Sequence, residues 1–115
     1  MHDIAAIKNR YLQDDVQRRL GGLASNMARI GSMCKLKTTQ TAVQGLIEES
    51  KWFIEWTAVE TNPETAVQLA DLQLELAFWQ SDWDRIWANP AVRAAISTHS
   101  KSWSDRILKL SGLLD

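Results

Sequence analysis

Apolar residues recur at steps of three and four positions along most of the chain, the spacing that places side chains on one face of an α-helix. Between residues 12 and 34 this pattern runs through the pair Gly21–Gly22 without changing phase, so we expect a continuous helix across the two glycines. β-Branched residues do not gather in alternating runs, and the pattern predicts no strands. The chain is therefore predicted to be all-α.

Helix-capping residues divide this pattern into four predicted helices. Thr38–Thr39 follows a basic stretch and is suited to cap a helix. Asn62–Pro63 and Asn89–Pro90 each place a capping residue before a proline, which is favoured in the first helical turn. The predicted helices span about 3–36, 39–60, 63–88 and 90–114. Because short connections favour antiparallel neighbours, we predict a four-helix up-and-down antiparallel bundle in one domain, residues 1–115.

Two parts of this bundle leave alternatives open. Ile4, Ile7 and Tyr11 point away from the apolar face of the rest of their predicted helix. Residues 1–11 therefore form an N-terminal arm that leaves the bundle, caps its end or contacts another chain. The connection at Ala88–Asn89 is so short that it makes either a hairpin or a sharp corner.

The helical periodicity also predicts which side chains form the core. In the second predicted helix the core face is Val43, Leu46, Ile47, Ser50, Phe53, Ile54 and Thr57. In the third it is Leu69, Leu72, Leu76, Trp79, Trp83, Ile86 and Trp87, and in the fourth Val92, Ala95, Ile96, His99, Trp103, Ile107, Leu110 and Leu114. Four of the six tryptophans lie on these faces, and we expect each of those indole N–H groups to meet a polar partner.

The second and third predicted helices each carry a further apolar stripe on the side opposite the core. In an antiparallel pair these two stripes lie level with one another and merge into one outer patch. A helix that is apolar on two sides is either buried on both or used for binding, and aromatic residues are typical of interface centres. The alternative is that the first helix or the N-terminal arm covers the patch. Its predicted members are Trp52, Trp56, Val59, Val67, Leu74 and Phe78.

Charge separates the predicted helices into two groups. Residues 1–37 carry a net charge of +4 and residues 90–115 of +2, whereas residues 38–62 carry −3 and residues 63–89 carry −4. In an up-and-down bundle the first and fourth helices are neighbours, so one half is predicted to be basic and the other acidic. Such fields orient partners more than they add affinity. A solvated surface with opposite charges across the helix contacts explains the pattern equally well.

Composition narrows the function classes. A net charge of −1 argues against nucleic-acid binding, and no apolar run is long enough to cross a membrane. The start of the chain lacks the features of a signal peptide, and Cys34 is the single cysteine, so we expect a cytoplasmic protein with that thiol buried as a small apolar residue. No catalytic motif or metal-ligand spacing occurs, so we expect neither an enzyme nor a metal site.

His99 is the one residue that suggests cofactor chemistry. The periodicity places it on the inward face of its helix between Ile96 and Trp103, with Arg106 at the edge of that face. A buried, neutral, hydrogen-bonded histidine is the simpler interpretation. The more specific interpretation is a site for a ligand or for a tetrapyrrole such as haem, formed by His99, Trp103 and Arg106. Met27 or Met33 would then be the second axial ligand.

Together these patterns predict a small non-enzymatic helical module that binds a protein partner or itself, as a homodimer, through the outer patch. No cofactor is expected under this hypothesis. The ligand- or tetrapyrrole-binding bundle around His99 is the alternative.

Overall fold

The computed structural model of the chain describes residues 3–114, and every regular element in that range is helical. The α-helices are α1 (Ile4–Gln13), α2 (Val16–Met33), α3 (Gln40–Thr57), α4 (Pro63–Ser81), α5 (Trp83–Ala88) and α6 (Pro90–Ser111), with the 3-10 turns η1 (Lys37–Thr39) and η2 (Ala58–Glu60). The all-α prediction is confirmed. The four-helix up-and-down bundle is not confirmed in that form, because two of the predicted helices are each broken into two.

The first break separates α1 from α2, so the single helix predicted over about 3–36 is wrong. Asp14 and Asp15 have extended backbones, and the Asp15 carboxylate accepts the backbone N–H of Arg18 at 2.9 Å. This is an N-cap, which starts a new helix at that point. The glycine pair Gly21–Gly22 lies inside α2 and does not interrupt it, as the unchanged apolar phase predicted.

The second break separates α4 from α5 at Asp82, so the single helix predicted over 63–88 is also wrong. Trp83 and Trp87 of α5 pack against each other with ring centroids 5.3 Å apart, and both are buried. The Trp87 indole donates to the carbonyl of Lys37 at 2.9 Å. Asn89 then caps α6 by accepting the N–H groups of Ala91 and Val92. The chain thus reverses through α5 rather than through a direct hairpin between α4 and α6.

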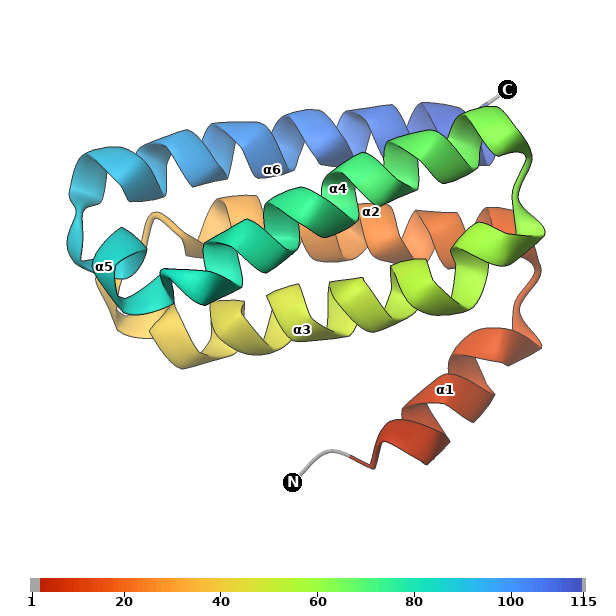
Figure 1. Cartoon of the computed structure of the whole chain (residues 1–115). Coiled ribbons are helices and arrows are strands. Elements are labelled where there is room, and N and C mark those ends of the chain that lie inside the picture. The colour runs from red at the N-terminus through yellow and green to blue at the C-terminus, as the bar shows by residue number, and fades with distance from the viewer. Residues whose placement is uncertain (1–2, 115) are drawn as a thin grey trace.

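In space, α2 lies between α6 and α3, and α4 runs obliquely across the outside of the molecule (Figure 1). The closest helix pair is α2 with α6, where small residues face one another. Ser97 donates to the carbonyl of Gly31 and Ser104 to that of Ala24, at 2.6 and 2.7 Å. The buried side of α6 therefore carries serines as well as Ile96, Trp103 and Ile107.

This packing corrects the core face predicted for the last helix. Ser97, Ser100 and Ser104 are buried, whereas the predicted core residues Ala95, His99 and Leu114 are exposed. Hydroxyl groups bonded to backbone carbonyls of a neighbouring helix can be buried at little cost, and apolar periodicity does not reveal such a face. The core faces predicted for the second and third helices are confirmed, since all fourteen of their residues are buried.

The buried tryptophans only partly follow the expected hydrogen bonding. Trp87 and Trp103 donate to Lys37 and to Glu75, as expected. The Trp83 indole N–H is buried without a hydrogen-bond partner among the described residues, so the expectation is wrong there. Cys34 is buried and free, as predicted, and its burial raises the pKa of the thiol to about 11.

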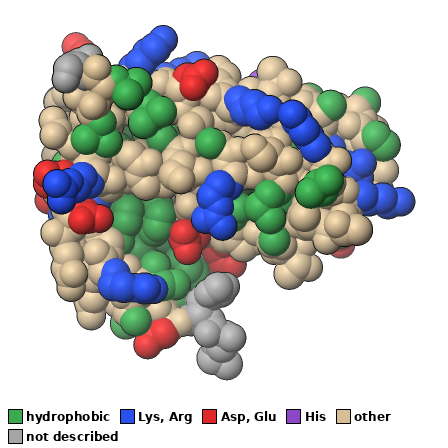
Figure 2. Space-filling view, turned by 180° about the vertical axis from the view of Figure 1, so that it is seen from behind, with side chains coloured by type: hydrophobic (Ala, Val, Ile, Leu, Met, Phe, Trp, Pro, Cys, Tyr) green, Lys and Arg blue, Asp and Glu red, His purple; other side chains and the backbone are tan. Residues whose placement is uncertain are grey.

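The N-terminal helix α1 stands apart from the other helices and is anchored at its C-terminal end (Figure 1). Tyr11 stacks on Phe53 of α3 with ring centroids 3.9 Å apart. Its hydroxyl donates to the carbonyl of Arg19 and accepts from Thr57. Hydrophobic side chains gather in the hollow between α1 and the rest of the molecule (Figure 2). The arm thus packs against α3 through Tyr11, an arrangement that none of the three predicted alternatives describes, and its contact with another chain stays a prediction.

Candidate functional site

Three large apolar side chains project from the outer side of α4. Val67, Leu74 and Phe78 are 63%, 71% and 70% exposed, although residues of their type are usually buried. Their spacing of seven and four positions places them in one row along the helix, which we call the α4 face. No other helix of the described chain lies over the outer side of α4 in Figure 1. The α4 face is therefore apolar surface that the monomer leaves uncovered.

The other predicted members of the outer patch have different surroundings. Val59 in η2 is 85% exposed, whereas Trp52 and Trp56 of α3 are half-buried. Trp56 packs beside Tyr11 at a centroid distance of 5.9 Å, and the Lys8 ammonium lies 5.8 Å from its ring. The N-terminal helix thus covers the Trp56 part of the patch. The α4 part remains exposed, so the predicted cover by the N-terminal segment is found for Trp56 only, and the use of the exposed part for binding stays a prediction.

The side-chain contacts between α3 and α4 agree with the prediction that the apolar stripes of these two helices lie level with one another. Lys51 donates from Nζ to Gln80 at 2.7 Å, and Gln73 donates to the carbonyl of Lys51 at 3.3 Å. Trp52 and Gln73 line one shallow hollow together. Glutamine and lysine side chains thus occupy the junction between Trp52 and the α4 face.

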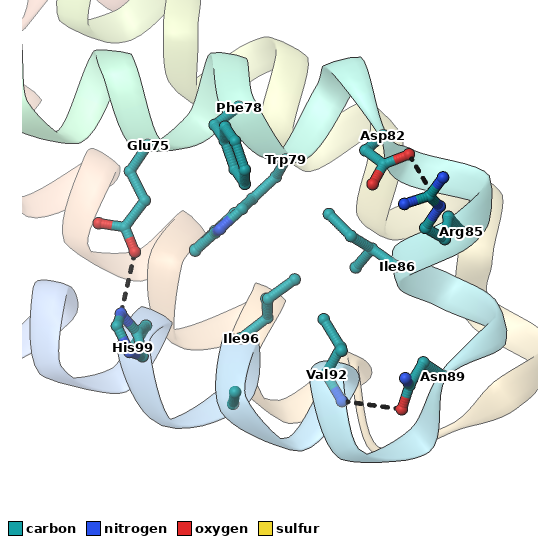
Figure 3. A pocket seen from close by; sticks show the side chains of 11 residues that line it. Glu75, Phe78, Trp79, Asp82, Arg85, Ile86, Asn89, Val92, Ile96 and His99 are labelled. Carbon is teal, nitrogen blue, oxygen red and sulfur yellow. Dashed lines mark hydrogen bonds and ion pairs between the residues drawn. The ribbon is translucent and has the colours of Figure 1, made fainter.

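An apolar groove adjoins the α4 face on the side away from α3, where α4 and α5 diverge from α6. Its volume is about 330 Å³, at the lower end of the range for small-ligand pockets. Figure 3 shows Phe78 and Trp79 reaching into it from α4, and Ile96 and Val92 facing them from α6. We call it the α4–α6 groove. Phe78 belongs both to this groove and to the α4 face, so the two form one continuous feature.

Charged pairs flank the two ends of this groove. At one end Glu75 accepts from His99 Nδ1 at 3.0 Å, and at the other Asp82 lies 3.7 Å from the Arg85 guanidinium (Figure 3). Glu75 also accepts the Trp103 indole N–H at 2.8 Å, and Arg106 lies over the Trp103 ring at 4.1 Å. The residues proposed from the sequence as a ligand site, His99, Trp103 and Arg106, are therefore brought together around Glu75.

His99 itself is not in the core. Its side chain is 62% exposed, so the predicted inward position is wrong. The reason is the buried serine side of α6, which rotates that helix and leaves His99 at the edge of the groove. The two hollows that His99 lines include no methionine of the described chain, and Met27 is fully buried in the core.

An acidic row runs beside the α4 face and was missed as a feature of the sequence. Glu64, Asp71 and Glu75 stand three positions before Val67, Leu74 and Phe78, respectively. Side chains three apart are neighbours on a helix surface, so each apolar residue of the face has a carboxylate beside it. Asp82, four positions after Phe78, continues the row. This repeat was readable in the sequence and would have indicated a charged border to the exposed stripe.

The charge groups predicted from the sequence also meet in space. The acidic helices α3 and α4 pack on each other, and the basic helices α2 and α6 form the closest pair. Lysines and arginines are spread over the face seen in Figure 2, which lies on the other side of the molecule from α4. The α4 face thus belongs to the acidic half, and the groove lies between that half and α6.

Two further features were sought in residues 3–114, a metal-ligand cluster and a membrane-spanning helix. No three histidine, cysteine, aspartate or glutamate side chains there gather as a metal site would need. None of the helices in this range combines the length and apolarity of a membrane span. Comparisons with protein-family models, with curated proteins and with solved structures gave no match.

Proposed function

We propose that this chain is a non-enzymatic protein-interaction module whose binding surface is the α4 face together with the α4–α6 groove. The observation that carries the proposal is the row of Val67, Leu74 and Phe78, each more than 60% exposed in a protein whose core already buries 22 hydrophobic residues. Exposed apolar rows of this kind are typical of interfaces. An aromatic residue beside a groove is the usual composition of an interface centre.

The centre of this binding surface lies on α4, and not across α3 and α4 as the sequence predicted. Val59 and Trp52 lie at its margin, and Trp56 is engaged by α1, so the contribution of α3 is smaller than the sequence suggested. Aromatic anchors at interface centres contribute most of the affinity, so we assign that role to Phe78, with Leu74 beside it.

The test uses one surface variant and one matched control. Leu74→Ser/Phe78→Ser removes the two most exposed side chains of the α4 face, and Leu36→Ser removes a 58% exposed leucine at a different place in the chain. Affinity capture from the native host, together with sedimentation of the purified proteins, is compared for wild type and both variants. We expect a specific partner, or a dimer, for wild type and Leu36→Ser and its loss for the double variant. Equal behaviour of all three proteins contradicts the proposal.

The alternative, a ligand or tetrapyrrole site around His99, stays a proposal with less support. Its favourable feature is that His99 lines an apolar groove beside Trp103 and Arg106. Against it, His99 Nδ1 is paired with Glu75, and no methionine lines either hollow within the described residues. An absorption spectrum of the protein purified from its native host tests it, because bound haem or bilin absorbs strongly in the visible range.

A further inference from the structure

We infer that the partner that binds the α4 face is a cationic amphipathic helix, a statement about partner chemistry that rests on the proposed function. Its apolar side would pack along Val67, Leu74 and Phe78 and place a large side chain in the α4–α6 groove. Its lysines or arginines would face the acidic row.

The shape favours a helix. The α4 face is a straight row with spacings of seven and four along a helix of 19 residues. A second helix laid along such a row contacts it with side chains at matching spacings, as in helix-in-groove complexes. The groove volume of about 330 Å³ is enough for one large side chain, and Trp79, Ile86 and Ile96 line it as an apolar pocket for such an anchor.

The charge favours a cationic partner. Glu64 and Asp71 are exposed and form no ion pair within the described chain. Asp82 has only the loose pair with the 85% exposed Arg85. Residues 63–89 together carry a net charge of −4. The acidic row would attract lysine or arginine side chains of a partner helix during the first encounter. The same charges would fix the orientation in which that helix binds.

The same charges disfavour two other occupants. A second copy of the chain bound through the same face would set one acidic row against another, because a two-fold interface brings identical patches together. Like charges juxtaposed at an interface oppose binding. A membrane with anionic headgroups would be repelled for the same reason.

The probes are designed helical peptides of about 18 residues that share one leucine and tryptophan face and differ in the polar face, which is either lysine or glutamate. A third peptide has the composition of the lysine peptide in scrambled order. Binding of each labelled peptide to the full chain is measured by fluorescence anisotropy at about 0.15 M salt, where weak surface charge effects are screened. We expect the lysine peptide to bind at least about tenfold more tightly than the other two.

Variants of the protein locate the binding. We expect Asp71→Asn/Asp82→Asn to weaken binding of the lysine peptide about tenfold, and Leu74→Ser/Phe78→Ser to abolish it. Asp105→Asn, at an exposed acid of α6, is the matched control and should change the affinity by less than about twofold. Circular dichroism of each variant verifies that the helices are intact.

The outcomes separate this inference from the proposed function. If the glutamate peptide binds as tightly as the lysine peptide, and Leu74→Ser/Phe78→Ser removes both, the partner chemistry is wrong and the interaction surface stands. A second outcome is that wild type forms a dimer, the double variant does not, and no peptide binds. The occupant of the α4 face is then a second copy of the chain, which also overturns the inference. If the lysine peptide binds wild type and the double variant equally, the partner chemistry and the surface are both wrong.

Discussion

Ser97 of α6 donates a hydrogen bond to the backbone carbonyl of Gly31 of α2 at 2.6 Å, and that glycine allows the two helices to approach. A Cβ atom added at Gly31 would lie 3.0 Å from the Ser97 carbonyl oxygen and 2.9 Å from Cγ of Lys101. The lysine side chain can move aside, but the backbone carbonyl cannot do so without shifting α6. The closest helix contact of the molecule therefore depends on the absence of a side chain at this position.

Gly31→Ala should lower the free energy of unfolding by about 1–3 kcal/mol, because overpacking outweighs the gain in helix propensity. Gly45→Ala in α3 is the matched control, since a Cβ there meets nothing within 4 Å. We expect that control to gain about 0.5–1 kcal/mol from helix propensity. Denaturant unfolding followed by circular dichroism measures both, and a stabilised Gly31→Ala protein would show that α2 and α6 are not this close.

Arg19 joins three segments and should be needed for the position of α1. Its side chain donates to the carbonyls of Leu12 and Asp14 at the end of α1 and pairs with Glu60 after α3. We expect Arg19→Met to lower the free energy of unfolding by about 2–4 kcal/mol, since it leaves those acceptors without their charged donor. The neighbouring Arg18→Met, at an exposed position, should stay within about 0.5 kcal/mol.

Hydrogen exchange distinguishes this role from a general loss of stability. In Arg19→Met the amides of α1 should lose more protection than those of α2 and α6, because Arg19 bonds the end of α1 directly. Uniform loss of protection over all helices would argue against a specific anchoring role.

Tyr11 should make the fold sensitive to alkaline pH. Burial raises its pKa from 10.0 to about 12, partly opposed by the hydrogen bond from Thr57. Because the folded-state pKa is the higher one, the folded protein holds this proton more tightly. The corresponding stability is complete below pH 10 and is lost as the pH rises towards 12.

The variant Tyr11→Phe should be less stable than wild type at neutral pH by about 1 kcal/mol, because two hydrogen bonds are lost. Between pH 10 and 12 its stability should fall less steeply than that of wild type. The comparison of the two unfolding curves at each pH isolates Tyr11 from the other groups that titrate in this range, such as Cys34. Parallel curves would mean that Tyr11 is already exposed to solvent.

The Cys34 thiol should react slowly with thiol reagents in the folded protein. Its side chain is 2% exposed, and burial raises its pKa to about 11, so the reactive thiolate is scarce at neutral pH. Reaction with a chromogenic disulfide should accelerate by orders of magnitude on addition of denaturant. Rapid labelling of the native protein would place the thiol at the surface.

Much of the helical arrangement could be predicted from the sequence, because apolar periodicity and capping residues act locally. Asn62 and Asn89 do cap α4 and α6, and the buried sides of α3, α4 and α5 follow the periodicity. The break at Asp15 does not appear in the apolar phase, because Leu12 and Val16 on its two sides are four positions apart, and only the preference of Asp for the N-cap position indicates it.

Features that depend on how helices pack could not be predicted in the same way. The serine side of α6 is buried against α2, where the hydroxyls of Ser97 and Ser104 donate to backbone carbonyls, and a hydropathy pattern does not contain this tertiary contact. The position of His99 follows from that rotation. The α4–α6 groove likewise arises from the divergence of two helices. The exposed row on α4, in contrast, was visible as a second apolar stripe.

The central claim is that the α4 face contacts another molecule, and photo-crosslinking in the native host tests it most directly. A photoreactive phenylalanine analogue is placed at position 78 in one protein and at position 36, an exposed leucine between α2 and η1, in another. We predict a discrete crosslinked adduct from position 78 and none from position 36. No adduct from position 78, or the same products from positions 78 and 36, would contradict an interface at the α4 face.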